Sequence, residues 1–224
     1  KVVRSFAVGH TPVALNLSPD GQRLYACNQF DHTVSIVDLN SGKEIAAIPV
    51  SREPVAAALT ADGKLLYVAN HLPAGAAHTE YLAAVVSVID TEIQQVVKTI
   101  ELPDGSTNLA GIAIAPDGRH AYITHILARY QFPVTYIERG WVNTNALTVL
   151  DLPEQRYINT VLLDDDKRGA ANPHGVACTA DGKHILVTHA GTHELSVIRR
   201  AGLHAHLRPA PNARGFRSSL SSTP

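Results

Sequence analysis

Hydrophobic and polar residues alternate along most of the chain in short segments, each bounded by turn residues. One such stretch, "SPDGQRLYACN" at residues 18–28, has close counterparts at 60–70, 115–125 and 179–189. Each copy follows a short apolar segment and precedes another alternating segment of the type "TVSIVDL". Asp-Gly between two alternating segments is a strong signal for a β-hairpin, because both turn positions accept a positive φ. The pattern therefore predicts an all-β chain built from repeats of one antiparallel unit.

The repeat has the length and strand number of a β-propeller blade. In the first three copies a further alternating segment follows, which gives four strands per repeat, and the first two turn aspartates lie 42 residues apart. Four strands in about 40 to 45 residues are typical of propeller blades. The fourth copy lacks its outer strand, and residues 1–9 would be the outer strand of a preceding or closing blade. The expected blades are residues 12–50, 54–102, 109–163 and 174–198.

The repeat resembles a known family. "LYACN", "LYVAN" and "AYITH", with "TVSIVD" and "VVSVID" downstream, resemble the YVTN-type β-propeller repeat over residues 1 to about 198. Within this region, "ILARYQFPVTYIERGWVNTNALTVLDL" and "NPHGVACTADGK" resemble the propellers that accompany cytochrome c peroxidase-like di-haem domains in bacterial secreted proteins. The resemblance implies a ring of about seven blades, of which this chain supplies about four. The alternative is a closed four-bladed ring in which residues 1–9 complete the last blade.

The tight turns and the insertions fall on opposite faces of such a ring. The Asp-Gly turns mark one face, here named the plain face. The opposite face, here named the insert face, receives the second-strand ends, the loops after them and the loops that lead into each blade. Both long insertions, 71–84 and 125–145, lie on the insert face. Because long loops on a rigid scaffold commonly carry binding sites, we expect a partner or ligand there.

Histidine and asparagine share equivalent positions on the insert face. The second strands end in Asn28, Asn70, His125 and His189, and the adjoining loops contain His10, His71, His78, His174 and His193. One interpretation is that such side chains cap strand ends through hydrogen bonds to loop backbone. The other is that imidazoles converge on a transition metal or a haem edge, although their spacing matches no local metal motif. The candidate ligands are then His125, His189, His174 and His71.

A second candidate surface combines arginine with aromatic residues in the 125–145 insertion. That composition is enriched at interface hot spots, but the same residues could instead pack the insertion onto its own blade. The candidate partner-binding residues are His10, Asn28, Asn70, Arg129, Tyr130, Arg139, Trp141 and His193.

Outside the insert face, the sequence predicts solvated surface. His120 and His184 belong to plain-face hairpins, and His204 and His206 lie in the tail. The tail, residues 199–224, contains five arginines and no acidic residue and lacks apolar periodicity beyond "AGLHAHL". Apart from a helical turn or two at that segment, we expect the tail to be disordered.

Composition and motifs exclude several function classes. The 224 residues carry a net charge of −1, so no bulk attraction to nucleic acid is expected. No apolar stretch is long enough for a membrane span. The two cysteines belong to no CxxCH, so the chain attaches no c-type haem of its own. GxSxG, P-loop and HExxH motifs are absent, which argues against catalysis by this chain alone.

These observations favour a binding or scaffold module of the bacterial cell envelope, periplasmic or extracellular, that binds its partner through the insert face. The alternative is a redox-associated propeller that holds or docks a haem or copper centre and has a c-type cytochrome domain as its partner. A third reading is a lactonase-like metal-dependent hydrolase. Such an enzyme needs carboxylates around a metal, whereas the strand ends here carry Asn and His.

Overall fold

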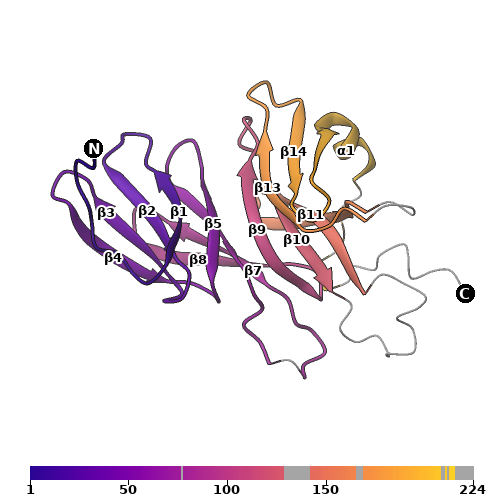
Figure 1. Cartoon of the computed structure of the whole chain (residues 1–224), viewed down its shortest axis with the longest axis horizontal. Coiled ribbons are helices and arrows are strands. Elements are labelled where there is room, and N and C mark those ends of the chain that lie inside the picture. The colour runs from indigo at the N-terminus through magenta and orange to yellow at the C-terminus, as the bar shows by residue number, and fades with distance from the viewer. Residues whose placement is uncertain (77, 129–141, 165–168, 208–209, 211, 215–224) are drawn as a thin grey trace, which may run out of the picture.

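Four antiparallel sheets follow one another along the chain, and a short helix comes after the last (Figure 1). The computed structural model describes residues 1–76, 78–128, 142–164, 169–207, 210 and 212–214. Each sheet is ordered as it runs in sequence, so every strand pairs with its sequence neighbours. The all-β fold predicted from the alternating pattern is therefore confirmed.

Three sheets have four strands and the fourth has three. Blade 1 consists of β1 (Pro12–Leu17), β2 (Arg23–Asn28), β3 (Thr33–Asp38) and β4 (Lys43–Pro49). Blade 2 consists of β5 (Pro54–Leu59), β6 (Leu65–Asn70), β7 (Val85–Asp90) and β8 (Gln95–Glu101). Blade 3 consists of β9 (Ser106–Ile114), β10 (His120–Ala128), β11 (Asn143–Asp151) and β12 (Arg156–Leu162). Blade 4 consists of β13 (Pro173–Cys178), β14 (His184–His189) and β15 (Glu194–Arg199).

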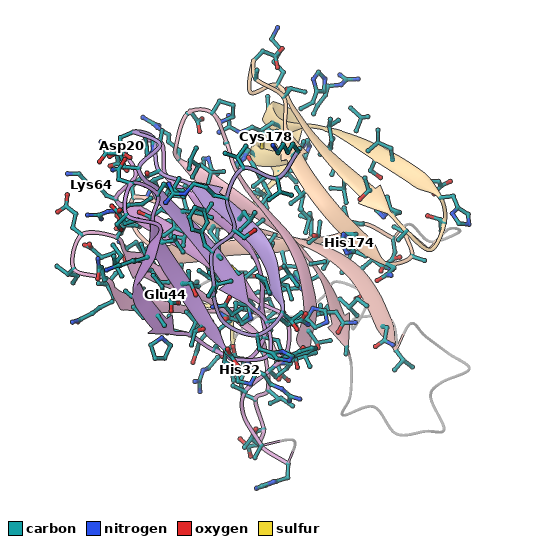
Figure 2. All side chains as sticks on the ribbon, turned by 60° about the vertical axis from the view of Figure 1, so that its left-hand side comes forward. Asp20, His32, Glu44, Lys64, His174 and Cys178 are labelled. Atoms are coloured by element: carbon teal, nitrogen blue, oxygen red, sulfur yellow. The ribbon has the colours of Figure 1, made fainter. Side chains whose placement is uncertain are left out.

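The Asp-Gly turns fix the first hairpin of each blade. In blade 1, Asp20 Oδ1 accepts hydrogen bonds from the Gln22 amide at 3.0 Å and from the Ser18 hydroxyl at 2.5 Å. Gly21 has a φ of +69°, a conformation that residues with a Cβ rarely adopt. Figure 2 shows Asp20 and Lys64, from two such turns, at one end of the molecule and His32 at the other. The plain face and the insert face are thus opposite ends of the blades.

The four blades form an open arc. The inner strands β1, β5, β9 and β13 contact one another in that order, whereas the described strands β13 and β1 share no comparable contact. Blades 1 and 4 accordingly lie at opposite ends of the arc (Figure 1). The chain therefore does not close on itself as a four-bladed ring.

The hydrophobic core lies between successive blades. One cluster joins blades 1 and 2 through Ile36 and Leu66, a second joins blades 2 and 3, and a third joins blades 3 and 4. We name the side of a blade that faces the following blade its front, and the side that faces the preceding blade its back. Each interior blade is thus apolar on both sides, which is why its strands read as nearly continuous hydrophobic runs.

Residues 1–9, expected to be an outer strand, form no strand in the structure. Arg4 Nη1 donates to the Leu39 carbonyl at 2.8 Å, at the plain-face end of blade 1. The His10 amide donates to Asp31 Oδ2 at 2.6 Å, at the insert-face end. The segment therefore runs along blade 1 in the same direction as β4. A strand requires a hydrogen-bonded partner, and no preceding sheet is present in the described chain to provide one.

The helical turn or two expected at "AGLHAHL" is present, and described residues of the tail make further contacts beyond it. Helix α1 (Arg200–His206) follows β15, and Leu203 and Leu207 pack against the core between blades 3 and 4. Farther along, Arg214 makes a two-pronged ion pair with Glu101 at 2.6 and 2.9 Å. The tail therefore packs on the core between blades 3 and 4 and reaches the outer strand of blade 2. In the described residues, no helix is long and apolar enough to cross a membrane.

Candidate functional site

The four equivalent strand-end residues share one arrangement. In each blade, the side chain that ends the second strand reaches a hydroxyl on the third strand of the same sheet. The pairs are Asn28 Nδ2 with Ser35 at 2.7 Å, Asn70 Nδ2 with Ser87 at 3.0 Å, His125 Nε2 with Thr148 at 2.8 Å, and His189 Nε2 with Ser196 at 2.8 Å. All four side chains are buried. They act as strand-end caps that bond a hydroxyl of the neighbouring strand. Backbone carbonyls take part as well, because Asn70 Nδ2 also donates to the Val85 carbonyl at 2.9 Å.

His125 lies at the end of a buried relay. Its Nδ1 lies 3.1 Å from the Ile126 carbonyl, which can only accept, so Nδ1 carries the proton. Nε2 therefore accepts from the Thr148 hydroxyl, which in turn accepts from Thr160 at 2.6 Å. Burial lowers the pKa of His125 to about 4. The imidazole is neutral, and both ring nitrogens are engaged within the blade.

Three caps leave one polar atom without a hydrogen-bond partner among the described residues. These atoms are Asn28 Oδ1, Asn70 Oδ1 and His189 Nδ1, and each is buried. Buried polar atoms are usually satisfied in folded proteins, so an additional polar group would be favourable at these points. The caps are therefore less complete in blades 1, 2 and 4 than in blade 3.

The structure does not bring the four candidate metal ligands into one set. His71 Nδ1 donates to the Leu109 carbonyl at 2.9 Å and so links blade 2 to blade 3. His174 is exposed on β13. Across the described ranges, no group of three or more His, Cys, Asp or Glu side chains is placed to hold a metal ion. His125 and His189 instead hydrogen-bond to hydroxyl groups within their own blades.

Among the described candidate partner-binding residues, His10 is exposed. Its ring lies against Phe30, with 5.6 Å between ring centroids, and Phe30 is 54% exposed. His193 is exposed in the loop between β14 and β15 and has a φ of +58°. Arg129, Tyr130, Arg139 and Trp141 lie outside the described residues.

A polar network that the sequence did not indicate lies on the plain face, under helix α1. Arg200 pairs with Asp117 and donates from Nε to the Tyr122 hydroxyl at 2.8 Å. Tyr122 in turn lies 2.7 Å from His204 Nε2, and Arg200 Nη2 lies 3.2 Å from His120 Nδ1. The two imidazoles are in contact, with centroids 4.3 Å apart. The network joins the hairpin of blade 3 to the tail.

Burial and neighbouring charges favour the neutral form of both histidines in this network. Burial, followed by the neighbouring His120 and Arg200, lowers the pKa of His204 to about 4. Burial and Arg200 also lower the pKa of His120. Burial raises the pKa of Tyr122 to about 12. Since the Arg200 guanidinium can only donate, the Tyr122 hydroxyl accepts a hydrogen bond from Arg200 and donates one to His204 Nε2.

Four residues of the network, Asp117, His120, Arg200 and His204, line a hollow of about 740 Å³ between two plain-face hairpins and α1. Arg119, Lys183 and Arg199 also line it and would suit an anionic group. The four network residues, however, bind one another, so the arrangement acts first as a clamp for α1. The sequence predicts solvated surface at His120 and His204, because the repeat pattern ends before the tail and gives no signal of this contact.

Comparison with known proteins supports the fold. No family model matches the chain. Over 126 residues, which are 51% of this chain and 33% of the relative, it is 27% identical to hydrazine synthase subunit beta of Kuenenia stuttgartiensis. The solved structure of Kuenenia stuttgartiensis hydrazine synthase superposes with a TM-score of 0.61 at 24% identity, over 92% of this chain and 70% of that chain. The match spans about a third of the curated relative, and together with the order of the four sheets the likeness shows a β-propeller fold.

Proposed function

We propose that this chain is a binding and scaffold module, a propeller of YVTN type that serves as a subunit of a protein assembly in the bacterial cell envelope. The observation that carries the proposal is the arrangement of the insert face. Its strand-end polar groups are used inside their own blades, while Phe30 and His10 present an exposed aromatic pair. Aromatic side chains dominate the binding energy of many protein interfaces.

The similarity to hydrazine synthase subunit beta supports a subunit role, because that relative is itself named as one component of an enzyme. A ring of about seven blades and a periplasmic or extracellular location belong to the same proposal. Its proposed partner is a c-type cytochrome domain, as implied by the resemblance to propellers that accompany di-haem domains.

A direct binding measurement tests this proposal. The probe is a purified di-haem c-type cytochrome domain of the cytochrome c peroxidase type, titrated with the chain by calorimetry. Phe30→Ala should weaken binding at least about tenfold, the scale of a hot-spot truncation. Ile93→Ala is the matched control, because Ile93 is 58% exposed but lies in the β7–β8 turn of the plain face. Equal losses in both variants would refute the insert-face assignment, and no binding would refute the cytochrome partner.

The alternative, in which the chain itself holds a haem or copper centre, has a separate and simple test. Purified protein would show a Soret band or stoichiometric copper if the alternative holds. A clean spectrum and metal-free protein favour the scaffold. The lactonase-like reading gains no support, because the described strand ends place amides and imidazoles, not carboxylates, at the equivalent positions.

A further inference from the structure

The plain-face end of blade 4 carries a positive charge where the other blades carry a negative one. The third strand ends in an aspartate in blades 1 to 3, namely Asp38, Asp90 and Asp151. That carboxylate holds the turn that follows, as Asp38 Oδ1 does by accepting from the Ser41 amide at 2.6 Å. In blade 4 the same strand ends in Arg199, opposite His184. Three blades fold without an arginine at this position, so the repeat itself does not require one.

Arg199 is one of three exposed cationic side chains that line the plain-face hollow. The other two, Arg119 and Lys183, belong to the turns of blades 3 and 4. Among the described residues, the side chains of Arg119 and Arg199 form no hydrogen bond or ion pair. Lys183 Nζ lies 3.5 Å from Asp181, in an exposed ion pair of the kind that contributes little stability. All three side chains are therefore available to a ligand.

The clamp beneath these side chains adds hydrogen-bond donors. Because Arg200 can only donate, His120 Nδ1 accepts its bond at 3.2 Å, and the neutral imidazole carries its proton on Nε2. The Tyr122 hydroxyl donates to His204 Nε2 at 2.7 Å, so that ring carries its proton on Nδ1. Neither N–H group has an acceptor among the described residues. Asp117, the one carboxylate among the described residues that line the hollow, is paired with Arg200.

The three exposed cations have no role in the clamp itself. Arg200 holds α1 through Asp117 and Tyr122, whereas Arg199, the N-cap residue of α1, makes no side-chain cap hydrogen bond. What the three cations share is the hollow that they line. A concave surface lined by charges of one sign concentrates their field and attracts ions of the opposite sign. The hollow therefore has the electrostatics of an anion site.

We propose that this hollow binds a phosphate-bearing anion. The three cations contact the phosphate oxygens, and the two imidazole N–H groups donate to them. A phosphate group has several acceptor oxygens and close to two negative charges at neutral pH, and it matches the planar fork of arginine. A single carboxylate would leave more of the positive charge unbalanced. The volume of about 740 Å³ lies within the roughly 300–1,000 Å³ of small-molecule sites, so it has room for more than one phosphate group.

Inorganic pyrophosphate is the probe for the first test. Calorimetric titration of the whole chain at neutral pH and low salt should show binding, and the melting temperature should rise with pyrophosphate concentration. Added sodium chloride should weaken the binding, because salt screens the exposed cations. No binding at low salt would overturn the proposal.

Substitutions then locate the site. Arg199→Asp gives blade 4 the residue that blades 1 to 3 carry and reverses a charge, so it should abolish pyrophosphate binding. Lys183→Ala should weaken binding roughly tenfold, the scale of one charge-assisted hydrogen bond. Lys64→Ala is the matched control. Its turn has the same sequence, its amide donates to Asp62 at 3.1 Å as that of Lys183 does to Asp181, and it lies outside the hollow. Equal losses in the two lysine variants would indicate non-specific attraction and overturn the proposal.

The variants change exposed side chains, so their circular dichroism should match that of the wild type. If Arg199→Asp unfolds, Arg199→Ala removes the same cation without adding a carboxylate. Vesicles of phosphatidylcholine with and without phosphatidate distinguish two sources of the phosphate. Phosphatidate-dependent cosedimentation that the Arg199 variant removes would assign it to a lipid headgroup, and no cosedimentation would assign it to a free phosphate compound. The site lies on the plain face, so these readouts are independent of cytochrome binding at the insert face.

Discussion

The two ends of the blades use histidine in different ways. On the insert face, His125 is enclosed by its own sheet and bonded to Thr148, a partner that the repeat supplies in every blade as Ser or Thr. On the plain face, His120 and His204 meet through the tail, and Arg200 links them to Tyr122. The first arrangement is fixed by local register, and the second by a long-range contact. The lowered pKa of His125 and that of His204 therefore arise in different surroundings, which mutations and pH can separate.

The pH dependence of stability should show the largest effect, and it centres on His125. Burial lowers the pKa of this imidazole from 6.5 to about 4. Above pH 6.5 the imidazole is neutral whether the chain is folded or unfolded, and its contribution is fully present. As pH falls from 6.5 toward 4, the unfolded chain takes up a proton that the folded chain resists, so stability is lost by up to about 3 kcal/mol.

Urea unfolding at pH 7, 5.5 and 4.5 measures this loss. His125→Asn removes the titrating group but keeps an amide of the kind that blades 1 and 2 use, so its stability should fall less over the same range. His204, whose pKa is also lowered to about 4, contributes in the same direction and persists in the variant. Identical pH profiles for wild type and variant would show that His125 is not insulated from protonation.

The plain-face clamp should give the next largest effect. Arg200→Ala removes the partner of Asp117 and a donor to Tyr122, and we expect a loss of about 2 kcal/mol, the scale of hydrogen bonds to a charged group. Arg199→Ala, at the exposed neighbouring position, should change stability by less than about 0.5 kcal/mol. Chemical denaturation measures both, and hydrogen exchange in α1 should rise only in the first variant. Equal effects would mean that Arg200 does not hold the helix.

The sequence predicts the features that recur in every blade, namely the hairpins and the residues that end the second strands. Period-2 alternation bounded by Asp-Gly turns locates the hairpins, because the turn conformation and the side-chain alternation are both local properties. The equivalence of Asn28, Asn70, His125 and His189 was also visible, since the four residues end the same strand. Their hydroxyl partners could have been found from the same register, because Ser or Thr recurs at the third position of "TVSIVD" and its copies.

What the sequence could not predict depends on contacts between segments far apart in the chain. Residues 1–9 alternate as a strand does but form no strand in the structure, and the tail packs Leu203 and Leu207 on the core between blades 3 and 4. Composition predicts disorder in the tail because it describes only the residues of the tail itself. It does not describe the apolar surface of the blades on which those residues can pack.

The smallest expected effect tests whether His189 differs from the caps of blades 1 and 2. His189→Asn keeps a donor for Ser196, as Asn28 does for Ser35, so stability should change by no more than about 1 kcal/mol. His189→Ala, which loses the bond, should cost more. If His125 and His189 instead served a metal, wild type would melt higher with added copper or zinc. The double change to Asn would then remove that rise, because an amide is a poor ligand for these ions. A metal-dependent rise in melting temperature that is present in wild type and absent in the double variant would overturn the assignment of these residues as caps. Melting temperatures that do not change with added metal would support that assignment.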